Sequence, residues 1–170
     1  MILKYLIPFE RRVVRSRLPV AEAIAALQAQ VEPARMFRFS IRDAKAFQGN
    51  IEGYGFRITR VIGYRNSFLP IIVGTFEPAP DGCVVRIQMR MHIAVMIFCA
   101  VWLSFLVPIL IGFIMASVAG RPGFGLTVLM PVGMLVFFLG LTNGGFWVEA
   151  NKQKKMLQDI FQGVAEERPL

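Results

Sequence analysis

An almost uninterrupted apolar block between Ile93 and Val148 constrains the fold of this chain more than any other feature. Residues 93–119 contain no charged side chain over 27 positions, and residues 126–148 contain none over 23. As helices these segments would measure about 40 Å and about 35 Å, against a hydrocarbon core of about 30 Å. The glycines and the proline in residues 120–125 favour a tight reversal. The sequence therefore predicts a transmembrane helical hairpin.

Positive charge is distributed unevenly around this predicted hairpin. Of 19 lysines and arginines, 14 precede the first apolar segment and four follow the second, while Arg121 alone lies at the hairpin tip. Segments rich in Lys and Arg next to a span stay on the cytoplasmic side of the membrane. We therefore expect a multi-pass protein of the cell membrane, the inner membrane in a bacterium, with both termini in the cytoplasm.

The residues outside the hairpin, 1–92 and 149–170, have the periodicities of one cytoplasmic α+β domain that is split by its own anchor. Alternating apolar residues predict strands around positions 5–9, 37–41, 56–62, 68–76 and 83–91. The last strand is the clearest, because a register slip of one residue would turn its arginines into the core. The expected sheet is small and antiparallel.

Two amphipathic helices complete the predicted domain. Apolar residues recur at helical spacing between Val20 and Val31, and Pro33 ends this helix. After the second span, Leu157 and Phe161 belong to an apolar stripe on a helix that can continue from the span. The sheet and this tail helix would otherwise both expose apolar surface to water. We therefore expect the C-terminal helix to return and cover the sheet.

This layout resembles two families in architecture. A sheet closed by a C-terminal helix is similar to the helix-grip fold of START-like lipid-binding domains, and also to small bacterial pleckstrin-like domains attached to two spans. The segment Tyr64–Pro70, Tyr-Arg-Asn-Ser-Phe-Leu-Pro, resembles a pattern of uncharacterised two-span bacterial membrane proteins. These resemblances imply a membrane-attached α+β fold and no particular activity.

The most distinctive polar stretch of the chain is Arg65, Asn66 and Ser67, between two predicted strands. Loop side chains of this kind can hold an anion or the backbone of a ligand. The alternative is a connector in which Asn66 and Ser67 bond their own backbone and Pro70 limits strand pairing. We favour the connector and keep the binding site as the second interpretation.

Five cations lie within a few residues of the spans and are expected to face an anionic leaflet surface. They are Arg86, Arg90, Lys152, Lys154 and Lys155. A basic protein held at a membrane needs no nucleic acid to explain its charge of +8, so we expect none as a partner.

Small residues repeat every four positions within both apolar segments, which is the spacing that lets membrane helices approach closely. They are Gly112, Ala116 and Gly120 in the first segment, and Gly140 and Gly144 in the second. Because the two groups lie at different depths, they cannot pack on each other. Each group packs against larger residues of the other span or against another subunit, and both alternatives stay open.

No catalytic, metal or cofactor motif is evident in the sequence. The single histidine, His92, has no cluster of Cys, His or carboxylate partners at ligand spacing. We therefore expect a non-enzymatic, membrane-anchored binding or adaptor module that binds a protein partner or the lipid surface. The alternatives are a carrier or sensor of a lipophilic ligand in a cavity between sheet and tail helix, and a homo-oligomeric pore.

Overall fold

The computed structural model describes residues 8–33 and 44–166. The elements follow in the order β1 (Phe9–Ser16), α2 (Val20–Gln30), β2 (Val31–Glu32), β3 (Phe47–Glu52), β4 (Gly55–Arg60), β5 (Ile71–Ala79), β6 (Gly82–Arg90), α3 (Ile93–Val118), the 3₁₀ turn η1 (Leu126–Val128), α4 (Leu129–Phe161) and β7 (Val164–Glu166). The predicted strand at 37–41, and most of the one at 5–9, lie outside the described residues.

All the described strands form one sheet in the order β2-β3-β4-β5-β6-β1-β7. Every pair is antiparallel except the short parallel pair of β2 and β3. The predicted α+β class is confirmed, with this one parallel pair as a correction to the antiparallel sheet. The register of β6 is also confirmed, because Val85, Ile87 and Met89 are buried and Arg86 and Arg90 are exposed on the other face.

Three boundaries differ from the predictions. β1 runs on through the basic stretch to Ser16, because it pairs with β6 along its whole length. α2 ends at Gln30, ahead of Pro33, because the next two residues pair with β3 instead of continuing the helix. The short edge strand β7, which pairs with β1, was not predicted.

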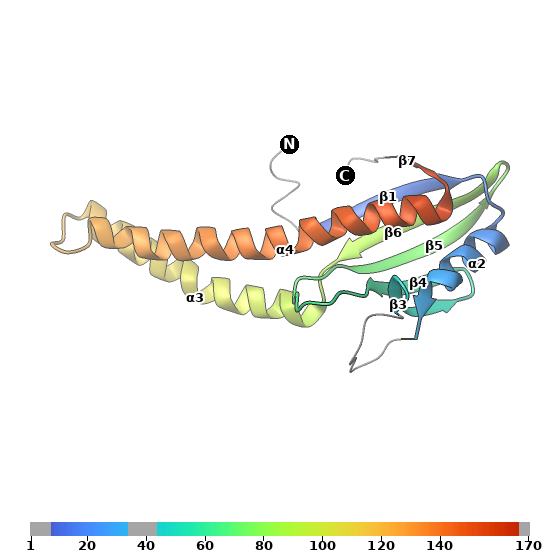
Figure 1. The fold of residues 1–170 in the computed structure, drawn as a ribbon. Helices are drawn as coiled ribbons and strands as arrows, with labels where there is room; N and C mark the ends of the chain where they lie inside the picture. Colours follow the sequence, from blue (N-terminus) through green and yellow to red (C-terminus); the bar gives the residue numbers. More distant parts are fainter. Residues whose placement is uncertain (1–7, 34–43, 167–170) are drawn as a thin grey trace.

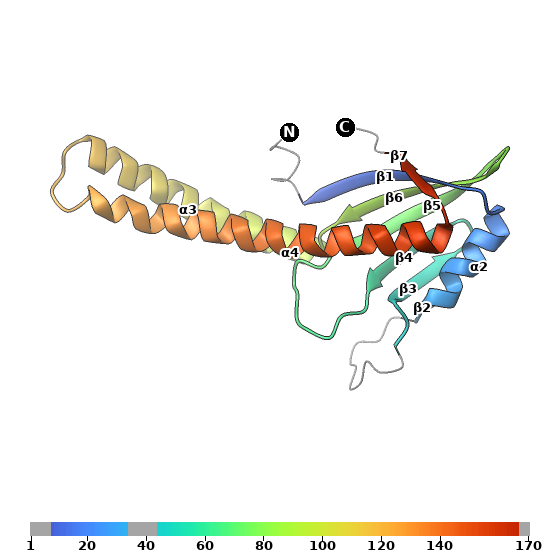
Figure 2. The ribbon, with the colours of Figure 1, turned by 45° about the horizontal axis from the view of Figure 1, so that its top comes forward.

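The C-terminal helix α4 is continuous from the hairpin into the core of the domain. Its last four turns cover one face of the sheet, beside α2 (Figure 1). Residues on its inward stripe are fully buried, among them Phe146, Ala150, Leu157 and Phe161. Figure 2 shows α4 passing in front of the strands. The predicted docking of the tail helix on the sheet is confirmed.

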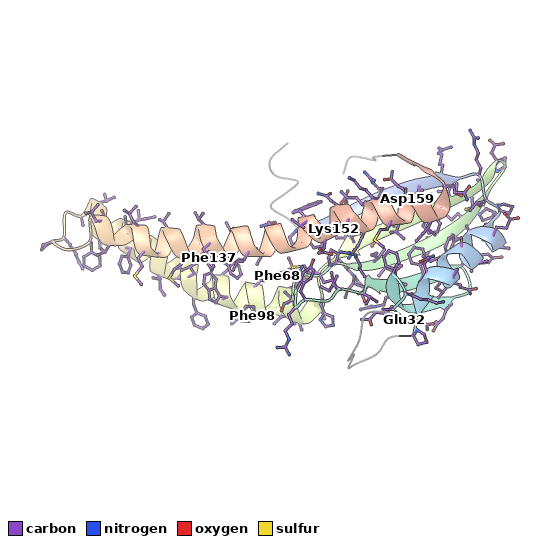
Figure 3. The ribbon with its side chains drawn as sticks, viewed as in Figure 1. Glu32, Phe68, Phe98, Phe137, Lys152 and Asp159 are labelled. Carbon is purple, nitrogen blue, oxygen red and sulfur yellow. The ribbon has the colours of Figure 1, made fainter. Side chains whose placement is uncertain are left out.

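The other half of the molecule is a hairpin of α3 and the first part of α4. Both helices are long and apolar enough to cross a membrane, with mean hydropathies of 2.7 and 1.9. Only 6% and 17% of their most apolar windows are buried, which is unlike the core helix of a soluble protein. Figure 3 shows side chains such as Phe98 and Phe137 pointing outward. Within the hairpin, Trp102 stacks on Phe138 with ring centroids 4.2 Å apart.

Candidate functional site

The first charged residue after the apolar run of α4, Glu149, is also one of the most buried charges in the described structure, with 1% of its side chain exposed. Its two carboxylate oxygens accept hydrogen bonds from three side chains. Arg60 Nη1 lies 2.6 Å from Oε2, while the Tyr64 hydroxyl and Lys152 Nζ, the latter at 3.1 Å, donate to Oε1. We call these four residues the Glu149 cluster.

The Glu149 cluster holds its carboxylate in the charged form. Burial alone would raise the pKa of Glu149, but the hydrogen bonds from Tyr64, Lys152 and Arg60 outweigh it, so that the pKa lies below its ordinary value. The hydrogen bond to Glu149, followed by burial, raises the pKa of Tyr64. At neutral pH the cluster is therefore a carboxylate, a neutral phenol and two cations.

The loop between β4 and β5 reaches α4 one turn nearer the hairpin. The Asn66 side-chain amide donates to the Gly145 carbonyl over 3.0 Å, and its Oδ1 accepts from the Phe68 backbone N–H, also over 3.0 Å. A Cβ at Gly145 would lie 3.0 Å from Phe68 Cδ2 and 3.3 Å from Asn66 Oδ1, so a side chain there would push the loop away by a few tenths of an ångström. Figure 3 places Phe68 where the hairpin meets the sheet. Asn66 and Phe68 thus hold this loop against α4, and we call these two contacts the Asn66 clamp.

A second ion pair holds the opposite flank of α4 against β1. Lys154 Nζ lies 2.9 Å from Oε2 of Glu10, with only 13% and 4% of the two side chains exposed. The same ammonium stands 5.6 Å from the ring centroid of the buried Trp147. Nearer the end of α4, the Ser16 hydroxyl donates to the Phe161 carbonyl over 2.6 Å. Together with the Glu149 cluster, these contacts fix the rotation of α4 on the sheet.

Between these two flanks, the inward stripe of α4 contains one polar residue, Gln153. Its side chain is fully buried, and neither its amide oxygen nor its amide nitrogen has a hydrogen-bond partner within the described residues. An unsatisfied buried amide is destabilising. The helix–sheet interface therefore contains one local defect in an otherwise apolar stripe.

The face of the sheet away from α2 and α4, which we call the open face, is covered by no helix among residues 8–33 and 44–166. The outward positions of the four central strands β4, β5, β6 and β1 bear five arginines and one glutamate: Arg57, Glu77, Arg86, Arg90, Arg11 and Arg15. Glu77 is paired with Arg86 at 2.6 Å. Half-buried apolar residues such as Val73 lie between them. The open face is therefore amphipathic and basic at its centre.

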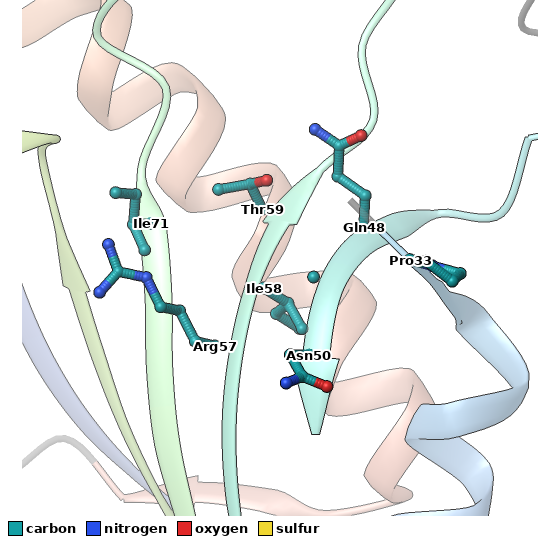
Figure 4. Close-up of a pocket in the computed structure, with 8 residues that line it drawn as sticks. Pro33, Gln48, Asn50, Arg57, Ile58, Thr59 and Ile71 are labelled. Atoms are coloured by element: carbon teal, nitrogen blue, oxygen red, sulfur yellow. The ribbon is translucent and has the colours of Figure 1, made fainter. Parts of the chain in front are cut away.

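A depression of about 420 Å³ lies on this face at β3 and β4. Figure 4 views it from the open side, with α4 behind the strands. The Arg57 guanidinium, the amides of Gln48 and Asn50, and the Thr59 hydroxyl line it. These groups donate hydrogen bonds to acidic or amide oxygens.

Of the three candidate binding residues in the β4–β5 loop, only Asn66 contacts the helix. Its bonds to its own loop agree with the favoured connector interpretation, and its bond to Gly145 adds a tertiary role. Arg65 and Ser67 are exposed. Of the five predicted membrane-surface cations, three form ion pairs within the domain: Arg86, Lys152 and Lys154. The other two, Arg90 and Lys155, are exposed.

The small residues of the hairpin do not mediate contact between its two helices. A Cβ placed at Gly112, Gly120, Gly140 or Gly144 would meet nothing within 4 Å. Ala116 is half-buried. The prediction that the glycines pack against the other span is therefore wrong for this hairpin, whose contact is made by large side chains. Contact with another subunit stays a prediction.

Sequence reasoning missed the Glu149 cluster. Arg60 and Tyr64 are 89 and 85 positions from Glu149, and nothing local links them. The available signal was the place of Glu149 itself, a lone carboxylate directly after a long charge-free segment, where an unpaired acid would be costly. Within the described ranges, no group of three His, Cys, Asp or Glu side chains gathers where it could hold a metal ion.

Comparisons of the chain with models of protein families, with curated proteins and with solved structures gave no match.

Proposed function

We propose that this protein is a non-enzymatic, membrane-anchored binding module whose open face recognises a protein partner with an acidic surface. The hairpin is its anchor. The observation that carries this proposal is the asymmetry of the sheet. Two helices cover one face, while the opposite face carries exposed arginines with half-buried apolar residues between them. Exposed mixed patches of this kind are typical of interaction surfaces.

The charge of the open face favours a partner other than a second copy of the chain. Two such faces brought together would oppose Arg11, Arg57 and Arg90 to one another, and like charges across an interface are unfavourable. An acidic surface would pair with them. Glu77 neutralises Arg86, so we assign contact with the partner to Arg11, Arg57 and Arg90.

The geometry of the sheet also favours a soluble partner over the bilayer for most of this face. The strands run alongside α4 (Figure 1), so the sheet stands away from the hairpin and does not lie flat beside its end. From Phe9 to Arg15 the open face extends about 20 Å, at about 3.4 Å per residue. Only the end near Arg90 is close to the start of α3.

The two other functions receive less support. A carrier needs a cavity between sheet and tail helix, but Ile87, Met89 and Leu157 are 2%, 2% and 1% exposed, which leaves no room for a ligand between them. In the hairpin, the hydroxyl of Thr142 and the side-chain N–H of Asn143 donate to carbonyls of their own helix, and Asn143 Oδ1 is buried with no hydrogen-bond partner among the described residues. Side chains turned onto their own helix in this way suit an anchor better than the lining of a pore.

We place the domain and both termini in the cytoplasm, with the hairpin in the inner membrane. The Lys and Arg bias described above supports this orientation. Arg90 and Lys155 are exposed near the spans and would attract an anionic leaflet.

A crosslinking experiment in cells tests the open face. A photoreactive residue at Val73 or Gln88, both on this face, should crosslink to a discrete partner protein. A photoreactive residue at Ala29, exposed on α2, is the matched control and should not. Charge reversal by Arg57→Glu should lower the crosslink yield more than about ten-fold, because it opposes like charges.

Two results would count against the open face as the recognition surface. The first is an equal yield from Ala29, which would indicate random collision. The second is a yield from Val73 that Arg57→Glu leaves unchanged although the variant folds normally.

A further inference from the structure

The cations around Glu149 exceed the negative charge that they surround. Arg60 and Lys152 share one carboxylate. A guanidinium has five N–H donors and an ammonium has three, and each uses only one on Glu149. Their side chains remain 24% and 51% exposed. The Glu149 cluster therefore presents spare donors and an uncompensated positive charge on its outer side.

Arg65 adds a further cation next to this cluster. The residue before it, Tyr64, donates to Glu149, and the residue after it, Asn66, donates to the Gly145 carbonyl. The backbone of Arg65 is therefore fixed beside α4 on both sides. Its side chain is exposed, and it makes no ion pair or hydrogen bond within the described part of the chain.

The depth of these residues follows from the length of α4. Leu129–Val148 measures about 30 Å, which equals the thickness of the hydrocarbon core. Glu149 then marks the boundary, and Lys152 lies about 6 Å beyond Val148, within the headgroup layer. Tyr64 is 53% exposed at this level, where an aromatic ring with a polar end is favoured.

We propose that Arg65, Lys152 and the spare donors of Arg60 bind the phosphate of an anionic phospholipid in the leaflet beside the domain. Glu149 does not touch the lipid in this arrangement. It positions two of the cations, and the Asn66 clamp positions the third. The ligand chemistry is a phosphate ester, and the depth of the site selects a lipid as its source over a soluble phosphate.

An anionic lipid suits the site better than a zwitterionic one because of the local charge. Among the described residues, Glu149 is the one carboxylate that pairs with Arg60 and Lys152, and Arg65 has none, so a headgroup with its own cation would leave the excess positive charge uncompensated. Each cation that contacts the phosphate should contribute about five-fold to the affinity for an anionic lipid in neutral detergent, where no charged leaflet attracts the other cations. This site is separate from the open face, so either proposal can fail without the other.

Lipid titration of the full chain tests this site. The protein in neutral detergent would be titrated with phosphatidylglycerol, with phosphatidylcholine or with inorganic phosphate, and bound molecules counted by native mass spectrometry. We expect saturable binding of phosphatidylglycerol. Arg65→Gln and Lys152→Gln should each weaken it about five-fold, and the double variant about 25-fold. Arg65→Gln disturbs no described contact, so its folding is not at risk.

The matched control is Lys155→Gln, which removes the same charge from an exposed position on the same helix without touching Glu149. It should change the affinity less than two-fold. Weakening equal to that of Lys152→Gln would show diffuse attraction instead of a site. Equal binding of phosphatidylcholine, or competition by inorganic phosphate at the same concentration, would also overturn the proposal.

Discussion

Two ion pairs of the same length allow the effect of burial to be separated from that of distance. Arg60–Glu149 and Arg86–Glu77 both measure 2.6 Å. Glu149 is 1% exposed, whereas Glu77 is 45% exposed and Arg86 49%. We compare Glu149→Gln with Glu77→Gln, because each keeps the side-chain shape and removes one charge.

The expected costs differ because only one carboxylate is buried. In Glu149→Gln one oxygen becomes an NH₂ group that faces a donor, and leaving a buried donor unpaired costs about 1–3 kcal/mol. Arg60 and Lys152 can turn partly to water, being 24% and 51% exposed, so we expect about 2 kcal/mol. Glu77→Gln should cost much less, because an exposed ion pair gains little over the contacts that its two groups make with water.

Trp147 provides the assay, because it is buried in the hydrophobic core of the domain. Urea unfolding of the full chain in micelles would be followed by its fluorescence, in a Trp102→Phe background that removes the only other tryptophan. Equal free energies of unfolding for the two glutamine variants would refute the reasoning that burial decides the value of these pairs.

Four further predictions concern the contacts of α4. Gly145→Val should displace the β4–β5 loop and expose it to protease, whereas Gly144→Val should not, because a Cβ at Gly144 meets nothing; equal protease sensitivity would contradict the clamp. Gln153→Met should raise the free energy of unfolding by about 1 kcal/mol by removing an unsatisfied buried amide, and a loss of stability would show that the amide has a partner. The raised pKa of Tyr64 means that the folded state keeps the phenol proton longer, so stability should fall as pH rises above the ordinary value of 10.0, and Tyr64→Phe should abolish that fall. The lowered pKa of Glu149 has the opposite consequence. The ionised carboxylate stabilises the fold at neutral pH, and this stabilisation is lost as pH falls below the ordinary value of 4.5. Glu149→Gln should remove this pH dependence of the free energy of unfolding.

The parts of the fold that the sequence predicted are those with a local period. The alternation in β6 specifies which face is buried, because a one-residue slip would bury arginines. The stripe containing Leu157 and Phe161 indicates a docked helix in the same way. These patterns can be read without knowledge of the partner element.

Most of β1 was not predicted from the sequence, because polar residues interrupt the apolar alternation on its buried face. Its inward face includes Glu10 and Ser16, which are polar residues that a core-facing strand rarely carries. They are satisfied by Lys154 and by the Phe161 carbonyl, about 145 positions away. A strand with polar residues on its buried face becomes recognisable only once the covering helix is in place.

The Glu149 cluster could not be predicted for the same reason, because its contacts join residues far apart in the sequence. The sequence analysis named Arg65, Asn66 and Ser67 as candidates, and whether they bind a ligand stays a prediction. It did not name Arg60 and Glu149, which pair with each other beside Tyr64. The sequence also does not distinguish Gly144 from Gly145, although one faces open space and the other the loop. The rotation of α4 decides this, and the rotation is set by the two ion pairs on its flanks.

Cysteine labelling tests most directly our proposal that the hairpin crosses a membrane and holds the α+β domain on the cytoplasmic side. Single cysteines at Arg121, Asp81 and Phe137, in a background without the two native cysteines, would be labelled with a membrane-impermeant reagent on intact cells. All three positions are exposed in the isolated chain. We predict labelling at Arg121 only, at Asp81 after the membrane is opened, and at Phe137 in neither condition. Labelling of Phe137 by the aqueous reagent, or of Asp81 on intact cells, would contradict the account.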